Sequence, residues 1–194
     1  MSWTRTTVIR AGAGAILTAT AISAGVYIAA AEDHTPSAAE AEAIKTAVAD
    51  SLDAFYSTAA SPGATETLTA LTSGQLDQKY AAAETRLRTL MEGPPLERAL
   101  YAMNQGRDAE KGIYRYVGGG ARVLDWTSVT IDGDTAHAAG RDESWLDTAV
   151  RDQSGHYTVG RGDGHDEFTV DLKKKPDGSW IVTESISNRD PNDN

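Results

Sequence analysis

The sequence predicts an α+β fold in which helices pack on a curved, antiparallel β-sheet. Between residues 37 and 104, apolar residues recur every three or four positions, which places them on one face of a helix. After Gly106 they alternate with polar residues, and short turn sequences separate the predicted strands. Helices followed by hairpin-connected strands are typical of an α+β layer fold. A curved sheet closed by helices on its inner face is cone-shaped, and the open end of the cone is a natural pocket.

An uncharged run, residues 11–31, precedes the predicted domain. As a helix this run is about 30 Å long, which is the thickness of the hydrocarbon core of a membrane. Arg5 and Arg10 lie before it and acidic residues after it, so the positive-inside rule places the following domain outside the cytoplasm. The small residues 29–31 also fit a signal-peptidase site. We therefore expect residues 1–31 to be a transmembrane signal anchor at the cell membrane, or a signal peptide whose cleavage leaves the domain secreted.

Polar segments mark the ends of the predicted domain. Residues 32–36 are predicted to be a tether, residues 37–187 the extracytoplasmic α+β domain and residues 188–194 a polar tail. The first helix of the domain begins with a capping box, because Ser37 and Glu40 are spaced so that each side chain can bond the backbone amide of the other. This helix is predicted to run to about residue 60, with one apolar face formed by Ile44, Val48, Leu52 and Phe55.

Three further helical segments are predicted before the strands. A short segment spans residues 65–71, and Ser73-Gly74 is expected to break it. The next spans residues 76–90. The last spans residues 96–104, with Pro95 at the first helical position, where a missing N–H costs nothing. This last helix is expected to bury Leu96, Leu100 and Met103.

The first predicted hairpin lies in a region rich in glycine and β-branched residues. A short strand at residues 114–117 is expected to end at the glycines 118–120. A second strand spans residues 122–131, and its return strand runs from residue 135 to about residue 146. Asp132-Gly133 between them predicts a type I′ turn.

The second predicted hairpin follows a polar stretch. The four glycines of residues 155–167 predict a mobile loop. The alternation of residues 168–173 then predicts a strand with one buried face and one wet face. Pro176-Asp177-Gly178 supplies a tight turn, and the last strand is expected to direct three apolar side chains inward, those of Trp180, Val182 and Ile186.

Composition excludes several classes of function. The chain has 28 acidic and 18 basic side chains, and without Arg5 and Arg10 the remainder carries a net charge of −12. Binding to nucleic acid and a polybasic attachment to anionic lipid both need clustered Lys and Arg, so neither is expected. Cysteine is absent, which excludes a disulfide, a thiolate nucleophile and a lipid-modified cysteine within these residues.

The last hairpin reads Lys175-Pro176-Asp177-Gly178-Ser179-Trp180-Ile181-Val182. This K-x-D-G-x-W-x-V pattern and the order of elements resemble the nuclear transport factor two-like (cystatin-like, SnoaL-like) superfamily. With its leader, the chain is also similar to the Mce-associated membrane proteins of bacterial envelopes. The resemblance implies the cone-shaped fold, but the superfamily includes isomerases, dehydratases, transport partners and modules without activity.

Enzymes of this superfamily use an Asp or His base and a Tyr donor inside the cone, and the resemblance offers candidates here in Tyr80, Tyr101, Tyr114, Asp125 and His137. If Asp125 faces inward with Val123 and Thr127, its carboxyl lies beside apolar residues and its pKa is raised. If Leu124 and Trp126 face inward instead, Asp125 faces solvent. No catalytic set is expected; the candidate pocket-lining residues are Asp125, Tyr80, Tyr101, Trp126 and Trp180.

A metal site is considered on the histidines near the predicted loop. His156, His165 and Asp166 lie close in sequence to Asp163 and Glu167, and residues 163, 165 and 167 would share one face of a strand. Metal sites need convergent ligands with supporting contacts, which a glycine-rich loop does not supply. No metal and no cofactor are expected.

These observations lead to two functional hypotheses. The first is a non-enzymatic accessory protein, tethered to the membrane through residues 11–31, that contacts a protein partner or a second copy of itself in a bacterial envelope or transport assembly. The alternative is a small-ligand-binding module or isomerase-like enzyme that uses the pocket between helices and sheet. Convergence of Asp125, Tyr80 and Tyr101 in a deep cavity would favour the alternative, and exposure to solvent would favour the first.

Overall fold

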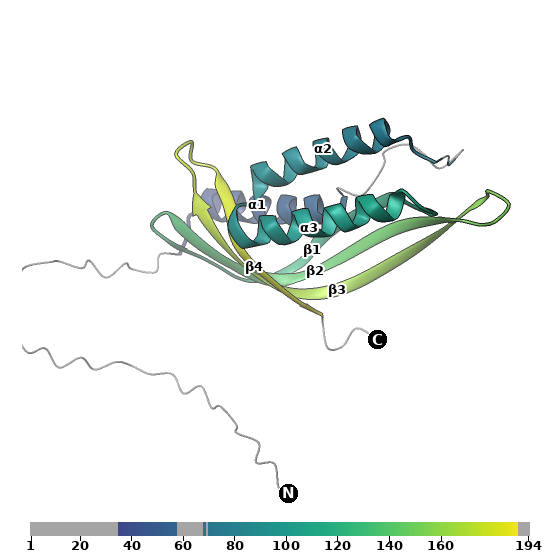
Figure 1. The fold of residues 1–194 in the computed structure, drawn as a ribbon. Helices are drawn as coiled ribbons and strands as arrows, with labels where there is room; N and C mark the ends of the chain where they lie inside the picture. Colours follow the sequence, from purple (N-terminus) through teal and green to yellow (C-terminus); the bar gives the residue numbers. More distant parts are fainter. Residues whose placement is uncertain (1–34, 58–67, 69, 190–194) are drawn as a thin grey trace, which may run out of the picture. The chain divides into compact units, whose positions relative to one another are not determined.

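The elements of the computed structural model follow the predicted order of helices and then strands. The model describes residues 35–57, 68 and 70–189. Within them, three helices precede four strands: α1 (Ala38–Ser57), α2 (Ser73–Leu90), α3 (Gly93–Glu110), β1 (Tyr114–Asp132), β2 (Thr135–Arg151), β3 (Tyr157–Lys174) and β4 (Trp180–Arg189). The strands form one antiparallel sheet in the order β1-β2-β3-β4, and the helices cover one face of this curved, open sheet (Figure 1). The α+β prediction is therefore confirmed.

Capping boxes set the first two helix starts. Before α1, the Glu40 amide donates to Ser37 Oγ at 3.3 Å and the Ser37 amide donates to the Glu40 carboxylate at 3.2 Å, as predicted. Before α2, Thr72 and Gln75 make the same reciprocal contacts. Ser73-Gly74 therefore begins a helix, and the prediction that it breaks one is wrong. Of the predicted helix at 65–71, residues 65–67 and 69 lie outside the described residues and Leu71 is not helical.

Helix α3 is longer than predicted at both ends. It begins at Gly93, whose φ of +63° suits glycine, and continues through Gly106 to Glu110. A Cβ on Gly106 would lie 3.3 Å from the ring of Tyr116 and 3.4 Å from the Tyr80 hydroxyl, so the absence of a side chain permits this close packing. Met103 is buried as expected, whereas Leu96 and Leu100 are half-buried against the core.

The strands are longer than predicted because backbone pairing continues through glycine. Strand β1 passes through the glycines 118–120, which lie opposite residues 145–147 of β2. Strand β3 includes most of the stretch predicted as a loop, and each residue from Tyr157 to Lys173 pairs with a residue of β2. The ladder hydrogen bonds use main-chain atoms alone, so a glycine-rich segment can pair with a formed neighbour.

Both hairpin turns occur near the predicted positions. The first has Gly133-Asp134 at its centre. Gly133 has a φ of +57°, but Asp134 does not have a positive φ, because among the described residues only glycines do. A type I′ turn needs positive φ at both central residues, so that predicted type is wrong. The second turn holds Gly178 at φ +85° and is closed by the Lys175 amide, which donates to the Ser179 carbonyl at 2.7 Å.

The core lies between the helices and the concave face of the sheet. It includes Ile44 and Val48 of α1, Leu87 of α2 and the alternating residues of β3. Trp180 and Val182 face this core, as predicted, but Ile186 is 54% exposed. A register shift at Asp171/Leu172, opposite the segment between Val182 and Glu184, changes which face the following residues of β4 present.

The predicted leader at 1–31 lies outside the described residues, as do residues 190–194 of the predicted tail. Within the part of the chain that the structure describes, no helix is both long enough and apolar enough to cross a membrane.

Candidate binding site

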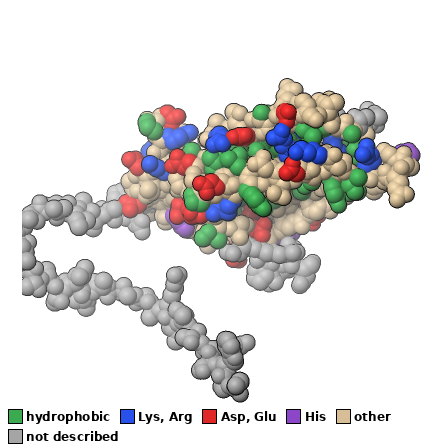
Figure 2. Space-filling model, viewed as in Figure 1, with side chains coloured by type: hydrophobic (Ala, Val, Ile, Leu, Met, Phe, Trp, Pro, Cys, Tyr) green, Lys and Arg blue, Asp and Glu red, His purple; other side chains and the backbone are tan. Residues whose placement is uncertain are grey.

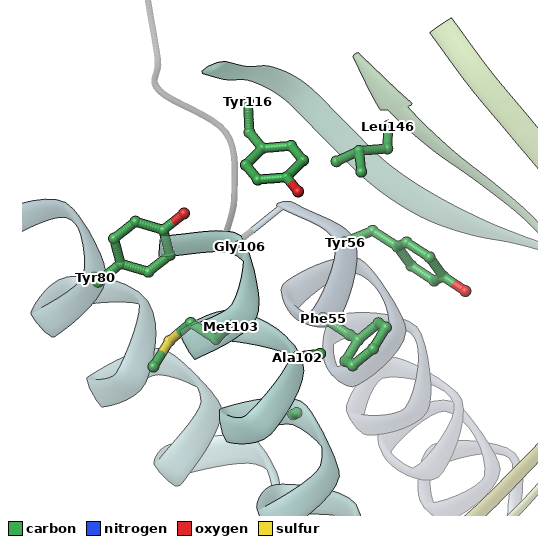
Figure 3. A pocket seen from close by; sticks show the side chains of 9 residues that line it. Phe55, Tyr56, Tyr80, Ala102, Met103, Gly106, Tyr116 and Leu146 are labelled. Carbon is green, nitrogen blue, oxygen red and sulfur yellow. The ribbon is translucent and has the colours of Figure 1, made fainter. Parts of the chain in front are cut away.

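Two cavities lie between the helices and the sheet, on either side of Phe55 and Tyr56 in the last turn of α1. The first has a volume of about 180 Å³ and the second about 250 Å³. Figure 3 shows Tyr80 and Tyr116 at the first cavity, with the Tyr56 hydroxyl pointing away from them. Enclosed sites for drug-sized ligands have volumes of roughly 300–1,000 Å³. Each cavity is smaller than that range.

The Tyr80 hydroxyl at the first cavity is part of a buried charge cluster. It donates a 2.7 Å hydrogen bond to Glu110 at the end of α3, and Lys79 Nζ donates to the same carboxylate at 2.6 and 2.8 Å. Arg115 lies 3.5 Å from it. Burial, followed by the bond to Glu110, raises the pKa of Tyr80, and burial lowers the pKa of Lys79. Tyr80 therefore stays protonated, and its proton is committed to Glu110.

The same cluster contacts the backbone of β1 at Tyr116. The Tyr116 amide donates to Glu110 at 2.9 Å, and the Tyr116 carbonyl lies 3.5 Å from Lys79 Nζ. Side chains of α2 and α3 thus occupy the backbone N–H and C=O of this one residue of β1. This arrangement gives Glu110 and Lys79 a structural role.

A second buried polar group, Asp142 of β2, was not identified from the sequence. Asp142 is only 1% exposed, and its Oδ1 accepts no hydrogen bond from the described residues. Burial, followed by the charge of Asp166, raises the pKa of Asp142 to about 6. Burial raises the pKa of the nearby Tyr56 hydroxyl, and Ser144 acts on it in the opposite direction. With a pKa of about 6, the Asp142 carboxyl could donate or accept a proton near neutral pH.

The alternation of β2 contains a signal for Asp142. Ala136, Ala138 and Gly140 are buried on the concave face, and the same period of two leads to Asp142 and Ser144. Strict alternation continued from Ala136, Ala138 and Gly140 therefore predicts that Asp142 lies on the concave face of the sheet.

The predicted pocket residues do not converge. Tyr80 lines the first cavity, but Tyr101 is 69% exposed on α3. Trp126 packs edge-on against Phe168, with ring centroids 5.6 Å apart, and Trp180 is buried in the core beside the N-terminal half of α1. Neither tryptophan lines the two cavities beside Phe55.

Asp125 faces the outer surface of the sheet, so its placement inside the cone is wrong. Its carboxylate accepts a 2.9 Å hydrogen bond from Arg141 Nε, and this bond lowers the pKa of Asp125. Register shifts on both sides, at Val123/Asp125 and Trp126/Ser128, let Val123 and Trp126 face the core while Asp125 faces out.

The remaining candidates lie outside the two cavities beside Phe55, and His137 lines a separate hollow formed by β1, β2, β3 and β4. His137 is exposed and contacts Asp171 at 2.7 Å, and Tyr114 is 43% exposed. His156 lies in the β2–β3 turn beside Ser154. Over residues 35–57, 68 and 70–189, no three His, Asp or Glu side chains gather closely enough to hold a metal ion.

Comparison with known proteins finds distant similarity to several solved structures. No protein-family model matches the chain, and no curated protein matches it. Among solved structures, CagV, a VirB8 homolog of T4SS from Helicobacter pylori, is 6% identical with a TM-score of 0.42, covering 76% of this chain and 98% of its own. An Ntf2 like protein involved in plasmid conjugation is 10% identical with a TM-score of 0.39, covering 75% and 48%. A candidate ketosteroid isomerase from Shewanella frigidimarina is 19% identical with a TM-score of 0.27, covering 59% and 93%. Similarity to Mce-associated proteins stays an expectation from the sequence.

Proposed function

We propose that residues 37–187 form a membrane-tethered, extracytoplasmic module that acts by protein–protein contact, without catalysing a reaction, in a bacterial envelope or transport assembly. One observation carries this proposal. Three large apolar side chains are exposed together at the end of the sheet where β1 and β3 begin and β2 ends, and a fourth is exposed on the opposite face of the same end. We call them the apolar end patch: Ile113, Tyr114, Val150 and Val159, each between 38% and 52% exposed.

Strand register brings the apolar end patch together. Tyr114 lies directly opposite Val150, and Ile113 is held beside them because its carbonyl accepts the Arg151 amide at 2.9 Å. Val159 pairs with Ala149, the neighbour of Val150, so it projects from the other face. The patch therefore wraps both faces at one end of the sheet. Grouped apolar exposure of this kind favours contact with another protein, whereas single exposed apolar residues are ordinary.

The rest of the outer sheet surface is less suited to burial. Neighbouring strands are joined across it by ion pairs, including Asp125–Arg141, Arg122–Glu143 and Asp147–Arg161. Acidic and basic side chains are also interspersed over the face seen in Figure 2, which is the side on which helix α3 lies in front of the strands in Figure 1. Burying such pairs would remove their hydration, which opposes association. Leu124 is exposed on this surface but does not belong to the patch.

The interior supports a role without catalysis. The polar groups of Tyr80, Glu110 and Lys79 are engaged with one another and with the backbone of β1. The two cavities beside Phe55 are smaller than those that usually enclose a metabolite. These observations favour the accessory role over an isomerase-like role.

Photocrosslinking in living cells tests the proposed contact. A photoreactive residue placed at Val159 or Tyr114 is expected to yield one discrete adduct with a protein partner or a second copy. The matched control is Leu124, which is 46% exposed but isolated from the patch. Equal adducts at all three positions, or none at the two patch positions, would contradict the proposal.

Protease accessibility tests the proposed location. Protease that reaches only the outer side of the cytoplasmic membrane should digest the domain, and the intact mass of the purified protein separates an anchor from a cleaved signal peptide. Protection of the domain until the membrane is dissolved would overturn the extracytoplasmic assignment.

Asp142 supports a second candidate function, the binding of a small ligand, because a buried carboxyl near apolar cavities can orient one. Indole, a flat apolar molecule, is a suitable probe of the first cavity in calorimetric titration. Under this candidate, Ala102→Leu fills the cavity and abolishes the binding heat, whereas Tyr101→Ala on the exposed side of the same helix preserves it. Absence of heat with the unsubstituted protein would count against this candidate.

A further inference from the structure

Two carboxyl groups face each other on the inner side of the sheet. Asp142 of β2 and Asp166 of β3 are partners in the antiparallel register, so their side chains project from the same face. That face is the concave one, because Phe168 and Val170 continue it on β3 and are 1% exposed. Like charges directly opposite each other destabilise a sheet. The pair is thus more stable with one proton bound than with both groups ionised.

The immediate surroundings of Asp142 provide little compensation for a negative charge on it. Strand β1 brings Val123, an apolar residue, opposite Asp142. On β3, His165 lowers the pKa of Asp142, but this effect is weaker than the increase that Asp166 causes. Helix α1 brings the Tyr56 hydroxyl, which carries no positive charge. On β4 the residue in register with Asp166 is Arg189. Asp142 itself is nearly enclosed, and its Oδ1 lacks a donor among the described residues.

Tyr56 connects this pair to the cavities. Its hydroxyl lies near Ser144, which is two residues beyond Asp142 on the same face of β2, and both carboxyl groups act on the Tyr56 hydroxyl. Its ring belongs to the walls of both cavities, and α1 ends one residue later at Ser57. Movement of Tyr56 therefore uncovers the carboxyl pair and removes part of the wall between the cavities.

We propose that the Asp142–Asp166 pair is a proton-operated latch, which holds the last turn of α1 against the sheet when it binds a proton and releases that turn when the proton leaves to solvent. With one proton bound, the pair carries a single charge and stays enclosed beneath Tyr56. Without it, two facing charges need water, and separating Tyr56 from Ser144 admits water with the least disruption of the core. The cavities then join into one larger space. This device goes beyond the proposed protein contact and does not depend on it.

Amide hydrogen exchange of the full-length protein in detergent tests the latch. Protection factors, which correct for intrinsic exchange, are compared at pH 5 and pH 7.5. Amides of residues 52–57 are expected to lose about tenfold or more in protection at the higher pH, relative to those of α2. A difference of one pKa unit between the closed and open states corresponds to about this factor. Asp142→Asn should abolish this loss, because a neutral amide cannot ionise.

Two further variants complete the test. Asp166→Asn leaves the buried Asp142 carboxyl without the facing charge and should weaken the pH dependence, so it carries the test if Asp142→Asn fails to fold. Asp163→Asn, at an exposed position of β3, is the matched control and should behave like the unsubstituted protein. Equal protection of residues 52–57 at both pH values, or pH dependence that neither inner substitution weakens, would overturn the proposal.

Discussion

The Tyr80 hydroxyl donates a 2.7 Å hydrogen bond to Glu110, a carboxylate whose side chain has no exposed surface. Lys79 contacts the same carboxylate from α2, and the Tyr116 amide contacts it from β1. One buried anion therefore joins α2, α3 and the first strand. Removing a single partner from such a cluster leaves another charge buried without compensation.

The Glu110→Gln substitution tests the contribution of this cluster. It preserves shape but removes the charge that offsets Lys79, so we expect the free energy of unfolding to fall by about 3 kcal/mol. Urea denaturation of the purified protein measures the change. The control is Glu84→Gln, which breaks the exposed pair with Arg88 and should cost about 0.5 kcal/mol or less. Equal effects of the two substitutions would show that the buried cluster is unimportant for stability.

Stability should depend on pH through Asp142. Its pKa is raised to about 6 in the folded chain, from about 3.8 when unfolded, so folding favours the protonated form. This contribution is fully present below pH 4 and is lost as pH rises through about 6. Relative to Asp142→Asn, the free energy of unfolding of the unsubstituted protein should fall by roughly 3 kcal/mol across that window. Denaturation at stepped pH values measures this difference, and a difference that stays constant or grows with pH would contradict the assignment.

Gly140 should tolerate no side chain. A Cβ there would meet the carbonyl oxygen of Asp125 and would lie 2.8 Å from the ring of Phe168, so the backbone of β1 would have to shift. We expect Gly140→Ala to lower the free energy of unfolding by about 1–3 kcal/mol. Gly162→Ala on β3 meets nothing within 4 Å and should be neutral or stabilising by up to about 1 kcal/mol. Thermal unfolding of both variants provides the comparison, and a stable Gly140→Ala variant would show that β1 is not held closely over this glycine.

The helical part of the fold follows from local chemistry. The capping box at Ser37 and Glu40 depends on residues three positions apart, so the sequence alone predicts where α1 begins. The box at Thr72 and Gln75 is equally local, but Ser73-Gly74 also favours a break because these residues are more common in turns. Both helix starts were therefore accessible from the sequence.

The strands depend on partners that are distant in sequence. The glycines of β3 carry no strand preference, and they pair because β2 offers a formed edge. The orientation of Asp125 depends on two bulges that no local pattern specifies, whereas Asp142 lies in an unbroken alternation with Ala138 and Gly140. The candidate site was thus predictable on the regular strand and not on the bulged one.

Photocrosslinking from Val159, compared between the unsubstituted chain and a Tyr114→Glu variant, tests the central claim most directly. The two side chains belong to the same apolar end patch but project from different faces. A charge at position 114 therefore weakens the binding of a partner that contacts both faces at this end of the sheet, and it leaves the photoreactive position unchanged. We expect a discrete adduct from Val159 that declines by about tenfold or more with Tyr114→Glu, as loss of an interface anchor worth over 1.4 kcal/mol would produce. A Val159 adduct that is absent, or that persists unchanged with Tyr114→Glu in a folded protein, would contradict a function based on contact through this patch.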